Sequence, residues 1–86
     1  MGPPPPDPES LRCFLAAAHQ LNFRAAAAFV GLSPAAFSDR IKRLEELLDA
    51  VLFERTTRRV ALTASGRRLV PVAGAALDAA RACHRA

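Results

Sequence analysis

The segment over residues 31–48 constrains the fold of this chain more than any other part of it. Gly31 comes first, and Ser33-Pro34 follows two residues later. Apolar side chains then recur at spacings of 4, 3 and 4 residues: Phe37, Ile41, Leu44 and Leu48. That spacing predicts one apolar stripe along a helix. Serine caps free N–H groups and proline suits the first helical position, so we expect a helix over 34–48 that follows a tight turn.

Two shorter helices are predicted before this segment. Asp7 and Pro8 mark the start of the first helix, which we expect to end near Gln20. Its apolar positions recur at helical spacing: Leu11, Phe14, Leu15 and Ala18. Asn22 is a suitable cap for the second helix, over about 24–29, which contains four consecutive alanines. A glycine-containing turn between two helices is typical of a helix-turn-helix, here at about residues 23–42.

After the third helix the pattern changes to a hairpin and a long last helix. Residues 51–54 and 59–62 predict two short strands joined by the loop Arg55-Thr56-Thr57-Arg58. Thr63 is expected to cap a helix from Ala64 to about His84, in which Pro71 predicts a bend or a local break. One face of this helix is apolar: Leu69, Val72, Ala73, Ala76, Leu77 and Ala80.

The pattern therefore predicts an all-α winged helix-turn-helix with a three-helix core, a small two-stranded wing and a long C-terminal helix. The wing covers about residues 51–62, and the whole domain covers residues 7–63. Residues 64–86 form a linker or dimerisation helix. Residues 1–6 contain four consecutive prolines and predict an extended, disordered tail.

Charge and composition favour an anionic partner. The net charge is +4, with five basic and six acidic side chains in residues 1–50 against seven and two in residues 51–86. All the basic residues except Lys42 are arginines, which suit phosphate and guanine. Aromatic residues are only 6% of the chain, without Trp or Tyr, which argues against a stacking platform for single-stranded nucleic acid.

Catalytic, metal and membrane patterns are missing from the sequence. There is no Ser/His/Asp or Cys/His set, no glycine-rich phosphate loop and no metal-ligand spacing at Cys13 or Cys83. We therefore expect a protein that is not an enzyme and needs no cofactor or metal. No secretory signal and no membrane-spanning run is visible, so we expect a cytoplasmic chain with reduced thiols.

The order of residues also resembles the N-terminal DNA-binding domain of LysR-type transcriptional regulators over about residues 11–77. The matching series is Leu11, Phe14, Asn22-Phe23, Ala26-Ala27, Ser33 to Ser38, Ile41, Leu44-Glu45, Leu52-Phe53, Arg55, Arg58, Val60, Leu62-Thr63 and Gly66. The chain departs from the family at five positions, where the resemblance implies Ser at Asn22, Thr at Arg24, Gln at Pro34, a basic residue at Asp39 and Gly at Asp49.

This resemblance implies sequence-specific binding of double-stranded DNA in transcriptional regulation. The last helix is expected to pair antiparallel with its copy in a homodimer, which presents two recognition helices to a partly palindromic operator. Regulators of this family carry an effector-binding domain after the linker helix, so we expect no small-molecule effector site within this chain.

The candidate DNA-binding residues come from the starts of two helices and from the wing. The opening turns of a recognition helix lie against base edges in the major groove, and arginines of a wing suit phosphate or the minor groove. The set is Asn22, Arg24, Ser33, Pro34, Ala35, Ser38, Asp39, Lys42, Arg55, Arg58 and Arg59. Because a carboxylate repels phosphate, Asp39 is expected to accept from a cytosine amino group if it faces DNA.

Several residues keep a structural alternative. Arg55 fits an internal structural role as well as a DNA contact, and Ser33 fits a role as a helix cap alone. Glu45 is interpreted as a structural carboxylate. For the whole chain, the alternatives are a helical dimerisation or interaction module that has lost DNA reading, favoured by Pro34 and Asp39, and a winged helix that binds structured RNA.

Overall fold

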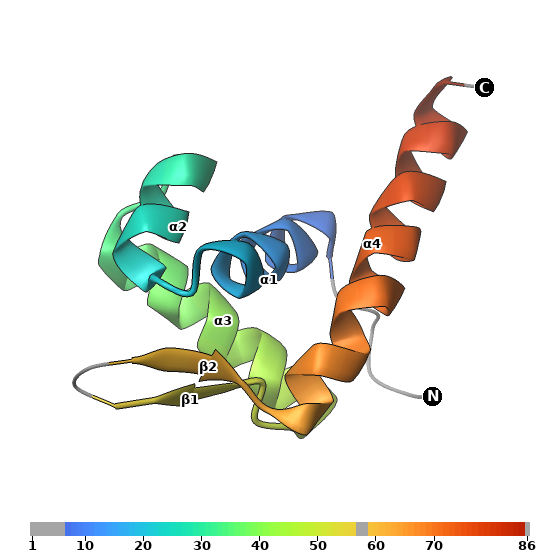
Figure 1. The fold of residues 1–86 in the computed structure, drawn as a ribbon. Helices are drawn as coiled ribbons and strands as arrows, with labels where there is room; N and C mark the ends of the chain where they lie inside the picture. The colour runs from blue at the N-terminus through green and yellow to red at the C-terminus, as the bar shows by residue number, and fades with distance from the viewer. Residues whose placement is uncertain (1–6, 57–58, 86) are drawn as a thin grey trace.

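Four helices and one antiparallel hairpin make up the part of the chain that the computed structural model describes, which is residues 7–56 and 59–85. The helices are α1 (Pro8–Gln20), α2 (Phe23–Val30), α3 (Pro34–Leu48) and α4 (Ala64–Arg85), and the strands are β1 (Phe53–Arg55) and β2 (Val60–Leu62). Helices α1 to α3 pack together, the hairpin extends from them as a wing, and α4 lies on the opposite side from the hairpin tip (Figure 1). The predicted winged helix-turn-helix is confirmed.

Side-chain caps start the first three helices at the predicted residues. Asp7 accepts a hydrogen bond from the backbone N–H of Ser10 at 2.9 Å, and Asn22 accepts one from Ala25 at 3.0 Å. Ser33 accepts one from the N–H of Ala36 at 3.2 Å. Gly31 ends α2 with φ 78°, a left-handed conformation that glycine adopts without steric cost. These local signals fix the turn that separates α2 from α3.

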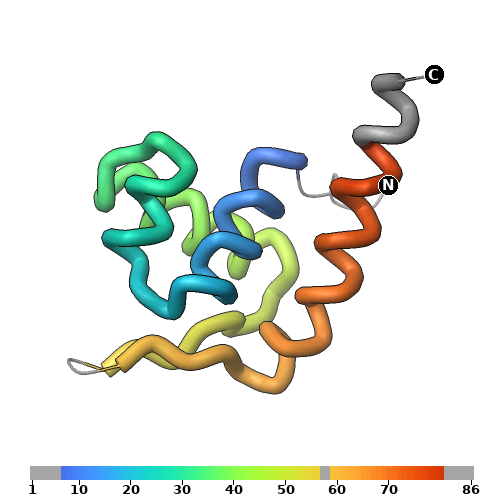
Figure 2. Tube along the Cα trace, turned by 45° about the horizontal axis from the view of Figure 1, so that its top comes forward, coloured from blue at the N-terminus to red at the C-terminus, as the bar shows by residue number. Residues whose placement is uncertain are grey.

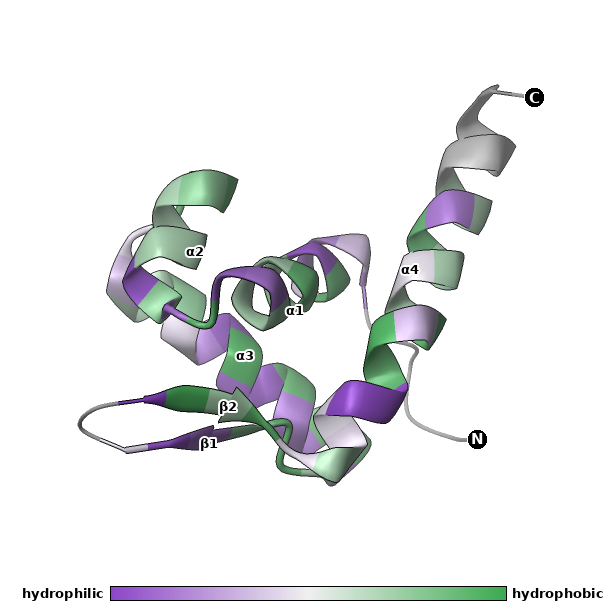
Figure 3. Ribbon diagram, in the orientation of Figure 1, coloured by the Kyte–Doolittle hydropathy of each residue, from purple (hydrophilic) through white to green (hydrophobic). Residues whose placement is uncertain are grey.

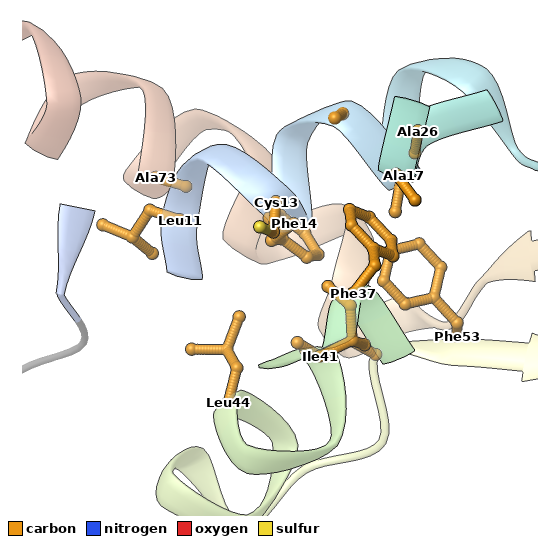
Figure 4. Close-up of a cluster of buried hydrophobic side chains, with 13 residues drawn as sticks. Leu11, Cys13, Phe14, Ala17, Ala26, Phe37, Ile41, Leu44, Phe53 and Ala73 are labelled. Atoms are coloured by element: carbon orange, nitrogen blue, oxygen red, sulfur yellow. The ribbon is translucent and has the colours of Figure 1, made fainter. Parts of the chain in front are cut away.

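Phenylalanine side chains from four elements meet at the core, where Figure 4 shows Phe14, Phe37 and Phe53. Phe14 of α1, Phe37 of α3 and Phe53 of β1 are buried. Phe23 of α2 is only partly buried, and its ring lies edge-on to Phe37 and Phe53 with centroid distances of 5.4 and 5.3 Å. Ala17 and Ala26 are fully buried where α1 and α2 meet, so the small side chains let these helices approach closely.

Glu45 joins α3 to the base of the wing. Its Oε2 accepts hydrogen bonds from the backbone N–H groups of Leu52 at 2.7 Å and Phe53 at 3.4 Å. This confirms the structural interpretation of Glu45. At the same end of the hairpin, the Thr63 hydroxyl donates to the Val51 carbonyl and accepts from the Gly66 N–H at 3.0 Å, so Thr63 caps α4 as predicted.

The strands of the wing are shorter than the sequence predicts. Phe53 pairs with Leu62, Glu54 with Ala61 and Arg55 with Val60. The predicted first strand, 51–54, was wrong by up to two residues because the Leu52 N–H bonds to Glu45 and not across the hairpin. Arg55 belongs to β1 and not to the loop. The other arginine predicted at the tip, Arg58, lies outside the described residues.

Helix α4 is continuous through Pro71, so the alternative of a local break was wrong. A proline inside a helix removes one hydrogen bond and costs about 3 kcal/mol. Packing on both sides of Pro71 offsets that cost, because Leu69 and Val70 before it and Ala73 and Leu77 after it contact the core.

This packing buries one part of the predicted dimerisation face of α4 and leaves the other part exposed. Ala73 is completely buried within the chain, so its side chain has no surface left for a partner. Leu69 and Leu77 are partly buried against the same core. Val72, Ala76 and Ala80 stay exposed. Figure 2 shows that the later turns of α4 extend beyond the three-helix core.

Asp49→Gly should raise the free energy of unfolding by about 1 kcal/mol. Asp49 ends α3 with φ 51°, a left-handed conformation that disfavours residues with a Cβ, and its carboxylate lies at the negative end of the helix dipole. Urea denaturation followed by circular dichroism measures the change. Asp49→Asn removes only the charge and should give about half the gain; equal stability of all three proteins would contradict the strain at this position.

Candidate nucleic-acid interface

The opening turns of α3 expose a row of small and polar side chains on the face opposite its buried stripe. Phe37, Ile41 and Leu44 face the core, whereas Ala35 and Lys42 are exposed on the opposite side. Ser33 and Pro34 at the start are also exposed, and Ser38 is half-buried at the edge of the row. Small side chains at the start of a helix allow its backbone to approach a partner closely. The predicted residues of α3 therefore share one accessible surface.

Charged pairs flank this surface. Asp39 forms an ion pair with Arg43, with 3.0 Å between Oδ2 and Nε, and both side chains are exposed. Arg40 reaches across to α1, where its Nη1 lies 3.6 Å from Asp7 Oδ2. Hydrogen bonds from Ser10, with a smaller contribution from Arg40, hold the pKa of Asp7 below its ordinary value. Two carboxylates near α3 are thus each neutralised by an arginine, while Lys42 on the same helix is exposed.

The start of α2 lies against the base of the wing. The guanidinium of Arg55 stacks over the ring of Phe23, with Cζ 4.5 Å from the ring centroid. Phe23 directly follows the capping residue Asn22, and Arg24 beside it is exposed. Arg55 stays exposed while it makes this cation–π contact, so it is not an internal arginine, and its DNA contact stays a prediction. Arg59 is exposed on the other side of the hairpin.

Two features of this surface were not predicted from the sequence. Arg43 was not among the candidate residues, although its spacing of four residues from Asp39 is a signal for an ion pair on a helix. The stacking of Arg55 on Phe23 joins residues 32 positions apart, so only the folded chain shows it. In Figure 3 one turn near the start of α4 is also strongly hydrophilic, and Arg67 of α4 donates to the Leu62 carbonyl at 3.1 Å.

Other kinds of site find little support in the described part of the chain. Residues 7–56 and 59–85 contain no group of three or more His, Cys, Asp or Glu side chains that could hold a metal ion. None of the described helices is long and apolar enough to cross a membrane. Cys13 is fully buried, and burial raises the pKa of its thiol, so it fills the core as an apolar side chain.

The fold and its exposed helix start define a winged helix-turn-helix domain. The family described as bacterial regulatory helix-turn-helix protein, lysR family, matches residues 8–67. The chain belongs to this family. A probable hydrogen peroxide-inducible genes activator from Streptomyces viridosporus is 48% identical over 64 residues, which are 74% of this chain and 20% of the relative. The chain thus spans about a fifth of the length of the curated relatives it matches.

Solved structures agree with this assignment. DarR of Vibrio fischeri, in complex with DNA, superposes with a TM-score of 0.88 and 30% identity over 92% of this chain and 27% of that chain. The complex of the CbnR DNA-binding domain with DNA gives a TM-score of 0.85 and 32% identity over 92% of both chains.

Proposed function

We propose that this chain is the DNA-binding part of a bacterial transcriptional regulator. Helix α3 lies in the major groove of double-stranded DNA, and the wing lies on the backbone or in the minor groove. The observation that carries the proposal is the accessible face of α3, where small and polar side chains from Ser33 to Lys42 stand opposite the buried stripe. The groove admits a helix that offers such a face.

The contacts divide into those that read bases and those that position the protein. Pro34 and Ala35 are small enough to contact a thymine methyl group, and Ser38 and Lys42 carry donors for base edges. Asn22 and Arg24 at the start of α2 suit a phosphate. Arg55, Arg58 and Arg59 of the wing supply cations for the backbone or the minor groove. Two relatives of similar fold are solved in complex with DNA, which supports this arrangement.

A homodimer through α4 fits the same function. Val72 is 61% exposed, and Ala76 and Ala80 continue its face along the helix. Pairing of this face with a second copy would present two α3 helices to the half-sites of a partly palindromic operator, about one DNA turn or a multiple apart. A DNA-binding module of a bacterial regulator acts in the cytoplasm, where the DNA is. Its proposed role is to bind DNA and not to catalyse a reaction.

The alternative of an interaction module that has lost DNA reading was favoured by Pro34 and Asp39. In the structure Arg43 neutralises this carboxylate, which weakens that argument. Titration of random duplex binding with salt separates the two functions. A DNA-binding protein loses affinity with a log–log slope of about −0.9 per neutralised phosphate. No binding, or binding that ignores salt, would support the interaction module, and preference for structured RNA would support the RNA-binding alternative.

Lys42→Ala and Ser38→Ala should each reduce discrimination between the selected operator and random duplex by about 1–3 kcal/mol. Both side chains lie on the accessible face of α3, where a base-edge contact is lost only on the correct sequence. Selection from a random duplex library supplies the operator, and fluorescence anisotropy measures both affinities. Equal losses on the two DNAs would remove these residues from the base-reading set.

A further inference from the structure

Asp39 and Arg43 form an ion pair on the exposed side of α3. Arg43 Nε lies 3.0 Å from Asp39 Oδ2, and the two positions are four residues apart on the helix. The Arg43 side chain is 77% exposed and that of Asp39 is 54% exposed. The two side chains are therefore in contact within α3 and still accessible to a partner.

The direction of this contact brings the guanidinium toward the start of the helix. Side chains on a helix lean toward its N-terminus, and the bond to Asp39 directs that of Arg43 one turn back. Asp39 lies in the second turn of α3, close to the exposed Ala35 and Ala36. Arg43 itself lies in the third turn of α3. Without the contact with Asp39, its guanidinium would lie farther from the opening turns, which are the part of α3 proposed to enter the major groove.

The chemistry of the pair selects a base. Asp39 contacts Arg43 at Nε, so this ion pair leaves the N–H groups of Nη1 and Nη2 as a planar fork. Two parallel donors match the O6 and N7 acceptors that guanine presents in the major groove. The same contact offsets the repulsion between the Asp39 carboxylate and the phosphates.

We propose that Arg43 reads a guanine in the major groove and that Asp39 is the positioning residue that aims its guanidinium. The proposal rests on the proposed function, since it assigns a specificity-determining residue to the same surface. Asp39 then acts through Arg43, and not as a direct acceptor from cytosine.

The test uses the whole chain and the duplex that it selects from a random library. Each guanine of that duplex is replaced in turn by 7-deazaguanine, which lacks the N7 acceptor. At one position per half-site, this replacement should lower the affinity of the wild-type chain about 10-fold or more, the size of a lost bidentate base contact. Arg43→Lys keeps the charge but not the fork, so it should lose a similar factor on the unmodified duplex and be insensitive to 7-deazaguanine.

Asp39→Ala distinguishes two effects of Asp39: its positioning of the Arg43 guanidinium and the repulsion of its charge by the DNA. Removal of a negative charge should raise affinity for random duplex, whereas the ratio of operator to random affinity should fall several-fold because Arg43 is no longer aimed. Glu46→Ala removes the same charge two turns further along α3 and should raise both affinities equally. Arg40→Lys is the matched control for Arg43→Lys, because Arg40 contacts Asp7 of α1, and it should leave the ratio unchanged.

The outcomes distinguish this proposal from the proposed function. If the wild-type chain selects no duplex, both fail together. If it selects a duplex that lacks guanine, or if Arg43→Lys keeps the wild-type ratio, the reading by Arg43 is wrong and DNA binding stands. The 7-deazaguanine series on the wild-type chain needs no variant, so it decides the question even if a substitution impairs folding.

Discussion

Gly66→Ala should lower the free energy of unfolding by about 3 kcal/mol, at the upper end of what overpacking costs. A Cβ atom on Gly66 would lie 2.3 Å from the carbonyl oxygen of Leu52 and 2.8 Å from Cδ2 of Leu62. The nearer of these atoms belongs to the backbone, so a change of rotamer cannot relieve the clash. Helix α4 and the base of the wing would have to move apart.

The backbone at Leu52 is held on both sides. Its carbonyl accepts the N–H of Thr63 at 3.0 Å, and its own N–H donates to Glu45 at 2.7 Å. Movement of this segment would therefore break the links between α3, the wing and α4. This explains physically why glycine stands three residues after the threonine that caps α4.

Gly74→Ala is the matched control for this prediction. Gly74 lies in the same helix, and a Cβ there would meet nothing within 4 Å. Alanine is a better helix former than glycine, so Gly74→Ala should stabilise the chain by about 0.5–1 kcal/mol. Thermal and urea unfolding of the two variants measure both changes. Similar effects of the two substitutions would show that the approach of α4 to Leu52 is not tight.

The helix starts were predictable from the sequence because their determinants are local. Asp7, Asn22 and Ser33 each cap a helix through the N–H three residues ahead, and Gly31 takes the left-handed conformation that its position requires. Three to four residues contain the whole signal in each case. The order of these helices was then enough to predict the helix-turn-helix and its accessible face.

The wing and α4 were less predictable because distant contacts decide them. Strand β1 begins later than its apolar pattern indicates, because the N–H of Leu52 donates to Glu45 of α3 and not to the opposite strand. The apolar face of α4 is one stripe in the sequence, but packing against α1 and β2 buries Ala73 and leaves Val72 exposed. Periodicity shows that a face is apolar, and it does not show which partner covers it.

Glu45→Ala should lower the free energy of unfolding by about 3 kcal/mol, the second large effect that the structure predicts. The partly buried carboxylate accepts N–H groups of Leu52 and Phe53, and a hydrogen bond to a charged group contributes about 1.5–3 kcal/mol. Truncation leaves these donors without their acceptor beside the core residues Leu52 and Phe53, both of which are buried.

The neighbouring residue provides the control, because Glu46 is exposed and Glu46→Ala should change stability by no more than about 0.5 kcal/mol. Glu45→Gln keeps an oxygen acceptor without the charge, so its loss should lie between those of the two alanine variants. Urea unfolding ranks the three proteins. Glu45 also holds the wing against α3, and the wing is proposed to contact the DNA backbone, which is the same in any sequence. A less firmly held wing in Glu45→Gln should therefore weaken binding to operator and to random duplex by similar factors. Alanine variants of equal stability at positions 45 and 46 would show that the wing is held by the core alone.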